Sequence, residues 1–194
     1  DDAGGAVSAG DMNGDGLTDI AFGAGVTNIG AYAFSLCAGL TNIVIECSVT
    51  GIGNYAFVGC PGLTSVTIPS SVVSIGIAPF VACSSLTNIS VAEDNPGCRD
   101  IGGVLYSKDG SALLTFPAGR GGTYAVPDGT ACLGQTAFAG AALTGLRLPA
   151  SVTNVGEVEV SYSIVLFGKE LRLSGSGVSF NVPGLTNISV AAEN

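Results

Sequence analysis

The chain has no histidine among its 194 residues. Histidine is the commonest general base in enzymes, the usual partner of serine and cysteine nucleophiles, and a frequent metal ligand. Its absence excludes those catalytic pairs and imidazole metal sites. Carboxylate pairs such as Asp109 with Asp128 remain as a catalytic alternative, although acids so spaced are more often solvated turn charges. We therefore predict that the chain is not an enzyme.

Basic residues and long apolar runs are also scarce. Six Lys and Arg stand against fifteen Asp and Glu, which gives a formal net charge of -9. Such a charge repels phosphate backbones and anionic membrane surfaces, so nucleic acid is not an expected partner. No stretch approaches 18 uninterrupted apolar residues, so we expect a chain that does not span a membrane. Because Asp1 is preceded by neither an initiator Met nor an apolar signal segment, we expect a mature or excised piece.

What the sequence does contain favours a folded, β-rich protein. Hydrophobic residues make up 47% of the chain and charged residues 11%, a balance that excludes disorder by composition. Glycine supplies 30 residues, and Ser, Thr, Val and Ala crowd the remainder. These residue types favour tight turns and short strands over long helices.

A 23-residue repeat organises the chain, and three consecutive units fill residues 26–94. Each unit reads L-x-x-I-x-I/V in its second half, where alternation sends Ile43 and Ile45 inward and Asn42 and Val44 outward. A single coil of this kind cannot bury its apolar face, so neighbouring coils must stack with their strands in a parallel sheet. The equivalent apolar positions are Ile29, Ile52 and Ile75; Phe34, Phe57 and Phe80; and Leu40, Leu63 and Leu86.

The same register extends in both directions, so we predict one β-rich solenoid over residues 1–194. Leu17, Ile20 and Phe22 lie 23 residues before Leu40, Ile43 and Ile45. Asp109-Gly110 between two strand-like runs indicates a hairpin. The predicted parts are a first coil with an Asp/Asn/Gly loop (1–25), three regular repeats (26–94), a hairpin insertion (95–129), a fourth repeat (130–151) and a last repeat (152–194) interrupted by a second insertion (157–179).

The segment IGNYAFVGCPGLTSVTIPSSV closely resembles the BspA-like type of leucine-rich repeat, whose motif runs I-G-x-x-A-F-x-x-C-x-x-L-x-x-[IV]-x-[IV]-P. The stretch NPGCRDIGGVLYSKDGSALLTFPAG is similar to the hairpin-bearing segment that such proteins carry between coils, with Cys98 in place of a Tyr. The resemblance implies a secreted or cell-surface protein, usually an adhesin or host-interaction module. It carries over no catalytic residues.

The amino-terminal loop resembles the calcium loop of FG-GAP repeats, D-x-[DN]-x-D-G-x-x-D. Hard Ca²⁺ prefers several oxygen ligands, and alternate residues around a glycine-permitted turn can converge on one ion. The predicted ligands are the side chains of Asp11, Asn13, Asp15 and Asp19 and the carbonyl of Leu17. The alternative is a bare turn, because Asn and Asp support turns without any metal. FG-GAP units normally recur around a propeller, and the single copy here excludes that fold.

The cysteines point to core positions rather than to a metal site. Cys37, Cys60 and Cys83 occupy the same place in three repeats, so they should stack inward about one strand spacing apart, roughly 4.8 Å. Buried cysteine is a common small core residue, and we expect reduced thiols, although a disulfide between adjacent coils is geometrically allowed. A disulfide between Cys98 and Cys132 across the first insertion is an alternative. No cysteine spacing matches a zinc pattern.

The outward strand positions form a small, polar face. Asn88-Ile-Ser90 and Asn187-Ile-Ser189 within it have the form of N-glycosylation acceptors, although an outward Asn in a repeated T-N-I is the plainer interpretation. Arg147 is the single residue in these columns of a type enriched at binding hot spots. The columns are Asp19, Asn42, Ser65, Asn88, Gly145 and Asn187, and Ala21, Val44, Thr67, Ser90, Arg147 and Ser189.

Two functional hypotheses follow. In the first, the chain is an adhesin-like binding module for a host or neighbouring-cell surface protein or a glycan, and the insertions supply the contact residues Arg99, Tyr106, Arg120, Tyr124 and Tyr162. In the second, it is a structural subunit that stacks head to tail into an extracellular filament. The second rests on the lack of an evident cap at the ends, since bare end coils expose apolar surface and unpaired strand edges.

Overall fold

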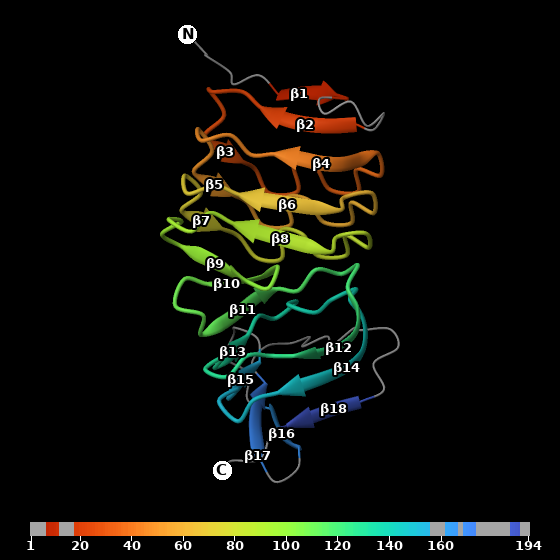
Figure 1. Cartoon of the computed structure of the whole chain (residues 1–194), viewed down its shortest axis with the longest axis vertical. Helices are drawn as coiled ribbons and strands as arrows, with labels where there is room; N and C mark the ends of the chain where they lie inside the picture. The colour runs from red at the N-terminus through yellow and green to blue at the C-terminus, as the bar shows by residue number, and fades with distance from the viewer. Residues whose placement is uncertain (1–6, 12–17, 156–161, 167–168, 174–186, 191–194) are drawn as a thin grey trace.

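The protein is an elongated stack of β-coils (Figure 1). The computed structural model describes residues 7–11, 18–155, 162–166, 169–173 and 187–190. Within these residues the regular elements are strands, and no helix is long and apolar enough to cross a membrane. The predicted β-rich repeat solenoid is confirmed.

The main sheet of the first half shows the 23-residue period directly. β2 (Thr18–Phe22), β4 (Leu40–Val44), β6 (Ser65–Ile68) and β8 (Asn88–Val91) lie side by side and parallel. Ile20, Ile43, Val66 and Ile89 are paired in register, each 23 residues from the next. The predicted alternation holds, because Ile43 and Ile45 are buried while Val44 is 40% exposed.

A second, narrow sheet closes the other side of the first core. β3 (Asn28–Ile29), β5 (Gly51–Ile52) and β7 (Ser74–Ile75) are parallel two-residue strands. Phenylalanines stack between the two sheets, with ring centroids 5.3 Å apart for Phe34 and Phe57 and 5.6 Å apart for Phe57 and Phe80. Nearly parallel rings, 7° and 12° apart, follow from equal positions in successive coils.

The turns between the two sheets are held by hydrogen bonds from coil to coil. In each turn two residues four positions apart have left-handed backbone, with φ of 57° at Tyr32 and 59° at Leu36, and 55° at Tyr55 in the next turn. Every second amide of the turn points along the stack. The bonds run from the amides of residues 32, 34 and 36 to the carbonyls of residues 54, 56 and 58, and from 55, 57 and 59 to 77, 79 and 81.

The amino-terminal end of the main sheet carries a strand that the repeat pattern does not contain. β1 (Val7–Gly10) pairs antiparallel with β2, with Gly10 opposite Asp19. It occupies the edge of β2 that the parallel stack would otherwise leave open. The expectation of a bare end is therefore wrong for β2, because an antiparallel strand covers its edge.

The hairpin predicted around Asp109-Gly110 is confirmed. β10 (Val104–Ser107) and β11 (Ala112–Thr115) are antiparallel on either side of it. The Asp109 carboxylate accepts hydrogen bonds from the Ser107 hydroxyl at 2.6 Å and from the Ser111 amide at 3.0 Å. These donors lower the pKa of Asp109 to about 2, so the carboxylate stays charged and bonded across the ordinary pH range.

β10 separates the solenoid into two hydrophobic cores. A further strand, β9 (Cys98–Ile101), pairs antiparallel with β10 and was not expected from the sequence. Along β10 the side chains alternate, so that Leu105 packs in the first core while Val104 and Tyr106 pack in the second. The predicted hairpin, visible in the middle of Figure 1, therefore contributes the strand β10 that lies between the two cores.

The second half resumes the pattern of stacked coils. β12 (Gly121–Ala125), β14 (Ala142–Leu148) and β18 (Asn187–Val190) form one parallel sheet. The opposite sheet joins β11, β13 (Cys132–Leu133), β15 (Asn154–Val155) and β17 (Lys169–Leu173), with β16 (Tyr162–Leu166) antiparallel to β17. β16 and β17 thus form an antiparallel pair within the second insertion. β11 and β12 belong to the stacked sheets, so residues 112–125 form a coil of their own.

Two polar side chains fix the junction between the regular coils and the hairpin. Buried Asn95 donates through Nδ2 to the carbonyls of Pro69 and Val72, at 2.7 and 2.9 Å. Its Oδ1 accepts from the amides of Gly97 and Cys98 at 2.9 and 3.0 Å. Asp100 accepts from the amide of Val91 at 3.0 Å and so occupies a hydrogen-bonding position at the edge of β8.

Replacing Asn95 with Ala should destabilise the protein by about 3 kcal/mol, because four backbone groups lose their partner, two of them in fully buried hydrogen bonds. Asn95→Asp keeps the acceptor but loses both donors, so it should fall between Asn95→Ala and the unmodified protein. Denaturant unfolding followed by circular dichroism measures both. A loss below about 1 kcal/mol for Asn95→Ala would show that water replaces the side chain and that this junction is not fixed by Asn95.

Candidate functional site

The outward face of the main sheet is polar and poor in anchoring side chains, as predicted. Small or polar residues occupy its exposed and half-buried positions, which include Asn42, Ser65, Thr67, Asn88 and Ser90. Val44 is its one exposed large apolar residue among those described, at 40%. Binding hot spots are enriched in Trp, Tyr and Arg, so this stretch of the face offers little to a tight partner.

Asp19 does not lie in the solvent as its outward position in the repeat predicts. It is fully buried, opposite Gly10 of β1 on one side and Asn42 of β4 on the other. The expectation of exposure fails because the sequence pattern does not contain β1, which adds a strand beyond the first repeat. Burying a carboxylate is costly unless a polar or charged partner compensates, so we expect polar surroundings for Asp19 at this end of the sheet.

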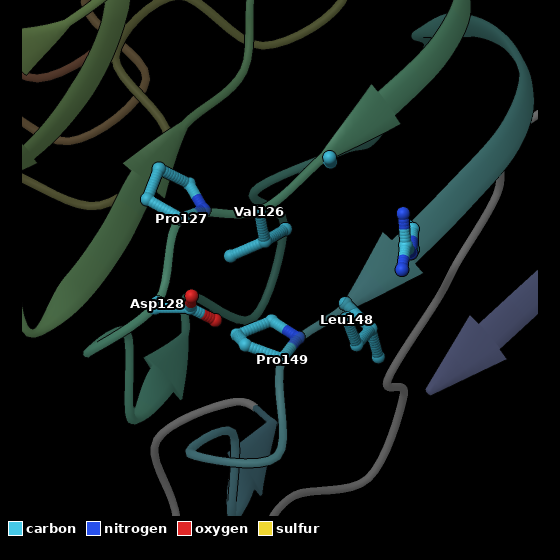
Figure 2. A pocket seen from close by; sticks show the side chains of 7 residues that line it. Val126, Pro127, Asp128, Leu148 and Pro149 are labelled. Atoms are coloured by element: carbon cyan, nitrogen blue, oxygen red, sulfur yellow. The ribbon is translucent and has the colours of Figure 1, made fainter. Parts of the chain in front are cut away.

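A shallow cleft lies at the carboxyl ends of β12 and β14. It has a volume of about 330 Å³ and is lined by residues 125–128 and 147–149. Figure 2 shows Val126 and Asp128 on one side of it and Leu148 and Pro149 on the other. Arg147 is exposed, and its guanidinium makes no hydrogen bond or ion pair with any other residue that the structure describes.

A second cleft occupies the corresponding edge of the first coils. It measures about 420 Å³ and lies between residues 21–24 at the end of β2 and residues 46–48 at the end of β4. Glu46 and Cys47 are exposed there. The two clefts thus share a location in the coil but differ in charge, because Arg147 and Asp128 line the first and Glu46 lines the second.

Two exposed large hydrophobic side chains lie close together on the turn of the first regular coil. Tyr32 is 57% exposed and Leu36 75% exposed. The Tyr32 ring stacks on that of Tyr55 in the next coil, with centroids 5.2 Å apart and planes 17° apart. The Leu36 side chain lies over Gly59, where a Cβ would come within 2.7 Å of its Cδ2. Tyr32, Leu36 and Tyr55 are called the turn patch below.

Sequence reasoning missed the turn patch. Tyr32 and Tyr55 occupy the position before A-F in the repeat motif, and Leu36 the position before the Cys, all of which the motif leaves variable. The third regular coil has Ala78 and Ala82 at these two places. A large apolar residue at a variable, outward position was the available signal, and it becomes visible only by comparing the coils.

The insertion residues proposed as contacts are in part core residues. Tyr106 is fully buried in the second core, and its hydroxyl lies 3.0 Å from that of half-buried Tyr124. Burial raises the pKa of both phenols. Arg120 donates to the Gly102 carbonyl at 2.7 Å and lies 5.5 Å from the centre of the Phe116 ring. The expectation of exposed contacts is therefore wrong for Tyr106, because β10 lies between two hydrophobic cores and its side chains pack into both.

The remaining insertion residues are placed only in part. Arg99 is exposed on β9, as expected of a contact residue. Tyr162 begins β16, and its side chain lies outside the described part of the structure.

The predicted calcium ligands are only partly within the described residues. Asp11 is exposed just after β1, and Asp19 is buried in β2. The pairing of Gly10 with Asp19 brings the two ends of the loop together, as convergence on one ion requires. Asn13, Asp15 and Leu17 lie outside the described residues. Among those that are described, no group of three or more Asp, Glu, Cys or His could hold a metal.

The two N-glycosylation motifs, which begin at Asn88 and Asn187, lie on β8 and β18. The Asn88 amide donates through Nδ2 to the Ser90 hydroxyl at 2.7 Å, and its Oδ1 lies against the backbone of Gly103. Asn187 begins β18, and its side chain lies outside the described part of the structure. Glycosylation of Asn88 and Asn187 stays a prediction.

None of the six cysteines forms a disulfide. Cys60 and Cys83 are fully buried in the first core, and Cys37 is half-buried beside them. Buried Cys98 donates to Asn95 Oδ1 at 3.4 Å instead of bonding to Cys132, so the alternative of a disulfide across the first insertion is not formed. Burial raises the pKa of Cys98 to about 11, so this thiol is unreactive at neutral pH.

Comparison with solved structures supports the fold. A leucine-rich cell surface protein from Faecalibacterium prausnitzii A2-165 is 29% identical with a TM-score of 0.69, over 87% of this chain and 40% of that one. The pneumococcal vaccine antigen PcpA is 24% identical with a TM-score of 0.70, over 89% of this chain and 50% of that one. The chain therefore spans half or less of the length of these two proteins.

Comparison with curated proteins finds no match. The family model of the BspA-type leucine-rich repeat region matches residues 12–117 with six copies. This range includes the 23-residue coils of the first half and the β9–β11 hairpins, whose stacking the structure shows. The chain belongs to the BspA-type leucine-rich repeat family.

Proposed function

We propose that the chain is an adhesin-like binding module, without catalytic activity, of a secreted or cell-surface repeat protein. The turn patch is its contact surface. The observation that carries this proposal is the exposure of two large apolar side chains, Tyr32 and Leu36, on backbone that disfavours them.

The backbone conformation of the patch is unusual for these residues. A left-handed φ at a bulky residue costs roughly 1 kcal/mol or more, which glycine would avoid. Tyr32 and Leu36 nevertheless have φ of 57° and 59° and point into solvent, where they add little to the core. Such strain at an exposed position is typical of sites kept for recognition.

A protein surface fits the patch better than a glycan as partner. The exposed Tyr32 ring, stacked on Tyr55, supplies a rigid aromatic anchor beside the aliphatic Leu36. Tyrosine is enriched at protein hot spots because it offers a large contact area with few rotatable bonds. The patch itself has no charged group, so we expect affinity from apolar burial rather than from salt bridges.

A location outside the cell is supported by a relative. The Faecalibacterium prausnitzii protein, which is 29% identical, is described as a leucine-rich cell surface protein. The net charge of -9 and the lack of histidine suit a solvated, non-catalytic surface module.

The double variant Tyr32→Ser with Leu36→Ser should weaken binding to a protein partner by about tenfold or more, because both anchors are lost. Partners are found by screening the unmodified chain against an array of cell-surface and matrix ectodomains and against a glycan array. Affinities for the hits are then measured by biolayer interferometry. Stability should change little, since both side chains are exposed.

Two matched variants locate the surface. Val44→Ser removes an exposed apolar residue from the main sheet and should leave binding unchanged. Arg147→Ala tests the cleft between β12 and β14. Loss of binding in Arg147→Ala with none in the double variant would move the contact surface to that cleft, and hits on glycans alone would refute a protein partner.

We also infer that the amino-terminal loop binds Ca²⁺. The buried carboxylate of Asp19, placed opposite Gly10 where the loop ends meet, supports this site. Titrating chelated protein with Ca²⁺ in a calorimeter should give one site and a raised melting temperature, because an ion bound only to the folded state stabilises it. Asp15→Ala should abolish the heat, while Asp94→Ala, an exposed acid elsewhere, should not. No heat in the unmodified protein would show that the loop is a bare turn.

A head-to-tail filament is the alternative function. β18 lies at the edge of its three-stranded sheet, and a second copy could add a strand there. Its other contact would have to be made by β1, since β1 covers the edge of β2. Size-exclusion chromatography with negative-stain microscopy should show concentration-dependent assembly if this holds. A monomer at every concentration would contradict it.

A further inference from the structure

The strand β12 is an open sheet edge in the middle of the stack. It pairs with β14 on one side only, since its three-stranded sheet has the order β12, β14, β18. Along the chain, β9, β10 and β11 come between β8 and β12, and all three join the seven-stranded sheet (Figure 1). The sheet that ends at β8 and the sheet that begins at β12 are therefore separate.

The backbone of β12 presents main-chain groups at this edge. The Val126 amide donates to the Arg147 carbonyl of β14 at 2.9 Å, and successive residues of a strand direct their hydrogen bonds to opposite sides. The N–H and C=O groups of Thr123 and Ala125 therefore point away from β14. On that side neither residue forms a backbone hydrogen bond with any part of the chain that the structure describes.

The edge is also accessible. Four of the five residues of β12 are exposed, and Tyr124, which packs against the second core, is half-buried. A Cβ added at Gly122 would meet nothing within 4 Å. By contrast, exposed and buried residues alternate along β6 and along most of β14. Exposure of nearly the whole strand leaves room for another chain beside it.

The edges of two other strands in the stack are covered. At β8 the Val91 amide donates to the Asp100 carboxylate at 3.0 Å, and the Ile89 amide donates to the Gly103 carbonyl at 3.0 Å. At β2 the cover is β1, an added antiparallel strand. Proteins usually cover an edge in this way or protect it with charged side chains or proline, because an open edge attracts further strands. β12, whose sequence is GGTYA, has neither charge nor proline.

We propose that β12 binds an extended peptide segment of a partner protein, which adds a fourth strand to the sheet of β12, β14 and β18. The groups offered at the edge are main-chain donors and acceptors, and an extended main chain matches their spacing. The small side chains of Gly121, Thr123 and Ala125 leave that approach open. This site is separate from the turn patch and does not depend on it.

Charge complementarity favours an acidic segment. Arg147 is exposed on β14 next to Ala125, and within the described part of the chain its guanidinium has no hydrogen-bond or ion-pair partner. An added strand would lie two strand spacings from β14, roughly 9.6 Å, which an arginine and a glutamate side chain span together across the small Ala125. Asp128 lines the same cleft but follows the end of β12, beyond the added strand.

Nuclear magnetic resonance on the full chain tests whether the edge is open. In the free protein the amide hydrogens of Thr123 and Ala125 should exchange with solvent about tenfold faster or more than that of Val126, which is bonded to β14. Equal protection of the three amides would show that the edge is already covered and would overturn the proposal. Protection that grows with protein concentration would assign the added strand to a second copy and so refute a separate partner.

Peptides selected from a random library displayed on phage serve as the probe. The selected peptides should be acidic, and adding one should slow exchange at Thr123 and Ala125. Ala125→Pro removes one edge donor and leaves the Val126 bond in place, so it should weaken peptide binding by about tenfold. Ala125→Ser keeps the amide and should bind as the unmodified chain does. Circular dichroism and melting temperature check that both variants fold.

Further variants separate the contributions of charge and of the turn patch. Arg147→Glu should weaken binding of the acidic peptides by about tenfold or more, whereas Arg99→Glu, at an exposed arginine on β9, should not. The double variant Tyr32→Ser with Leu36→Ser should leave peptide binding unchanged. A selection that enriches no peptide, or peptides that bind without slowing exchange at Thr123 and Ala125, would overturn the proposal. The exchange measurement uses the unmodified chain, so it remains decisive if Ala125→Pro fails to fold.

Discussion

Hydrogen bonds between successive coils hold the first half of this solenoid in register, and much of the surface follows from them. In each turn, alternate amides point along the stack to the carbonyls of the next coil, as from Phe34 to Ala56 and from Phe57 to Pro79. This requires left-handed backbone at every fourth residue, filled here by Tyr32 and Leu36 and by Ala78 and Ala82. Residues 23 apart are thereby placed directly above one another, so that Phe rings stack on Phe rings and thiols on thiols.

The regular stack of coils ends at β10, which lies between the two hydrophobic cores. β10 sends Leu105 into one core and Tyr106 into the other, so the two halves share a strand rather than a continuous sheet. The edge of β8 is covered by the hairpin, through the Asp100 carboxylate and the Gly103 carbonyl. This arrangement buries the aromatic residues of the first insertion in the second core. The side chains available for contact with a partner are therefore those exposed on the regular coils, such as Tyr32 and Leu36.

The sequence predicted the fold well but the candidate site poorly. The inward positions of each coil repeat with a fixed period. This period can be read from the sequence alone, whatever segment packs against the coil. Exposure of an outward side chain depends instead on what covers it. Asp19 and Tyr106 both occupy positions that the sequence gives to solvent or to loops, yet Asp19 is buried in β2 between β1 and β4, and Tyr106 is buried in the second core. Tyr32 and Leu36 are exposed for the opposite reason, since nothing described packs over these turns.

By itself the sequence determined the coil length, the inward ladders, the turn at Asp109-Gly110 and the family of the chain. These features depend on residues close together in the chain or at a fixed spacing along it. The tertiary structure alone decided that β1 covers β2 and that β10 divides the core. Each of these is a meeting of segments whose spacing carries no period, so only packing in space, with its burial and hydrogen bonding, selects it.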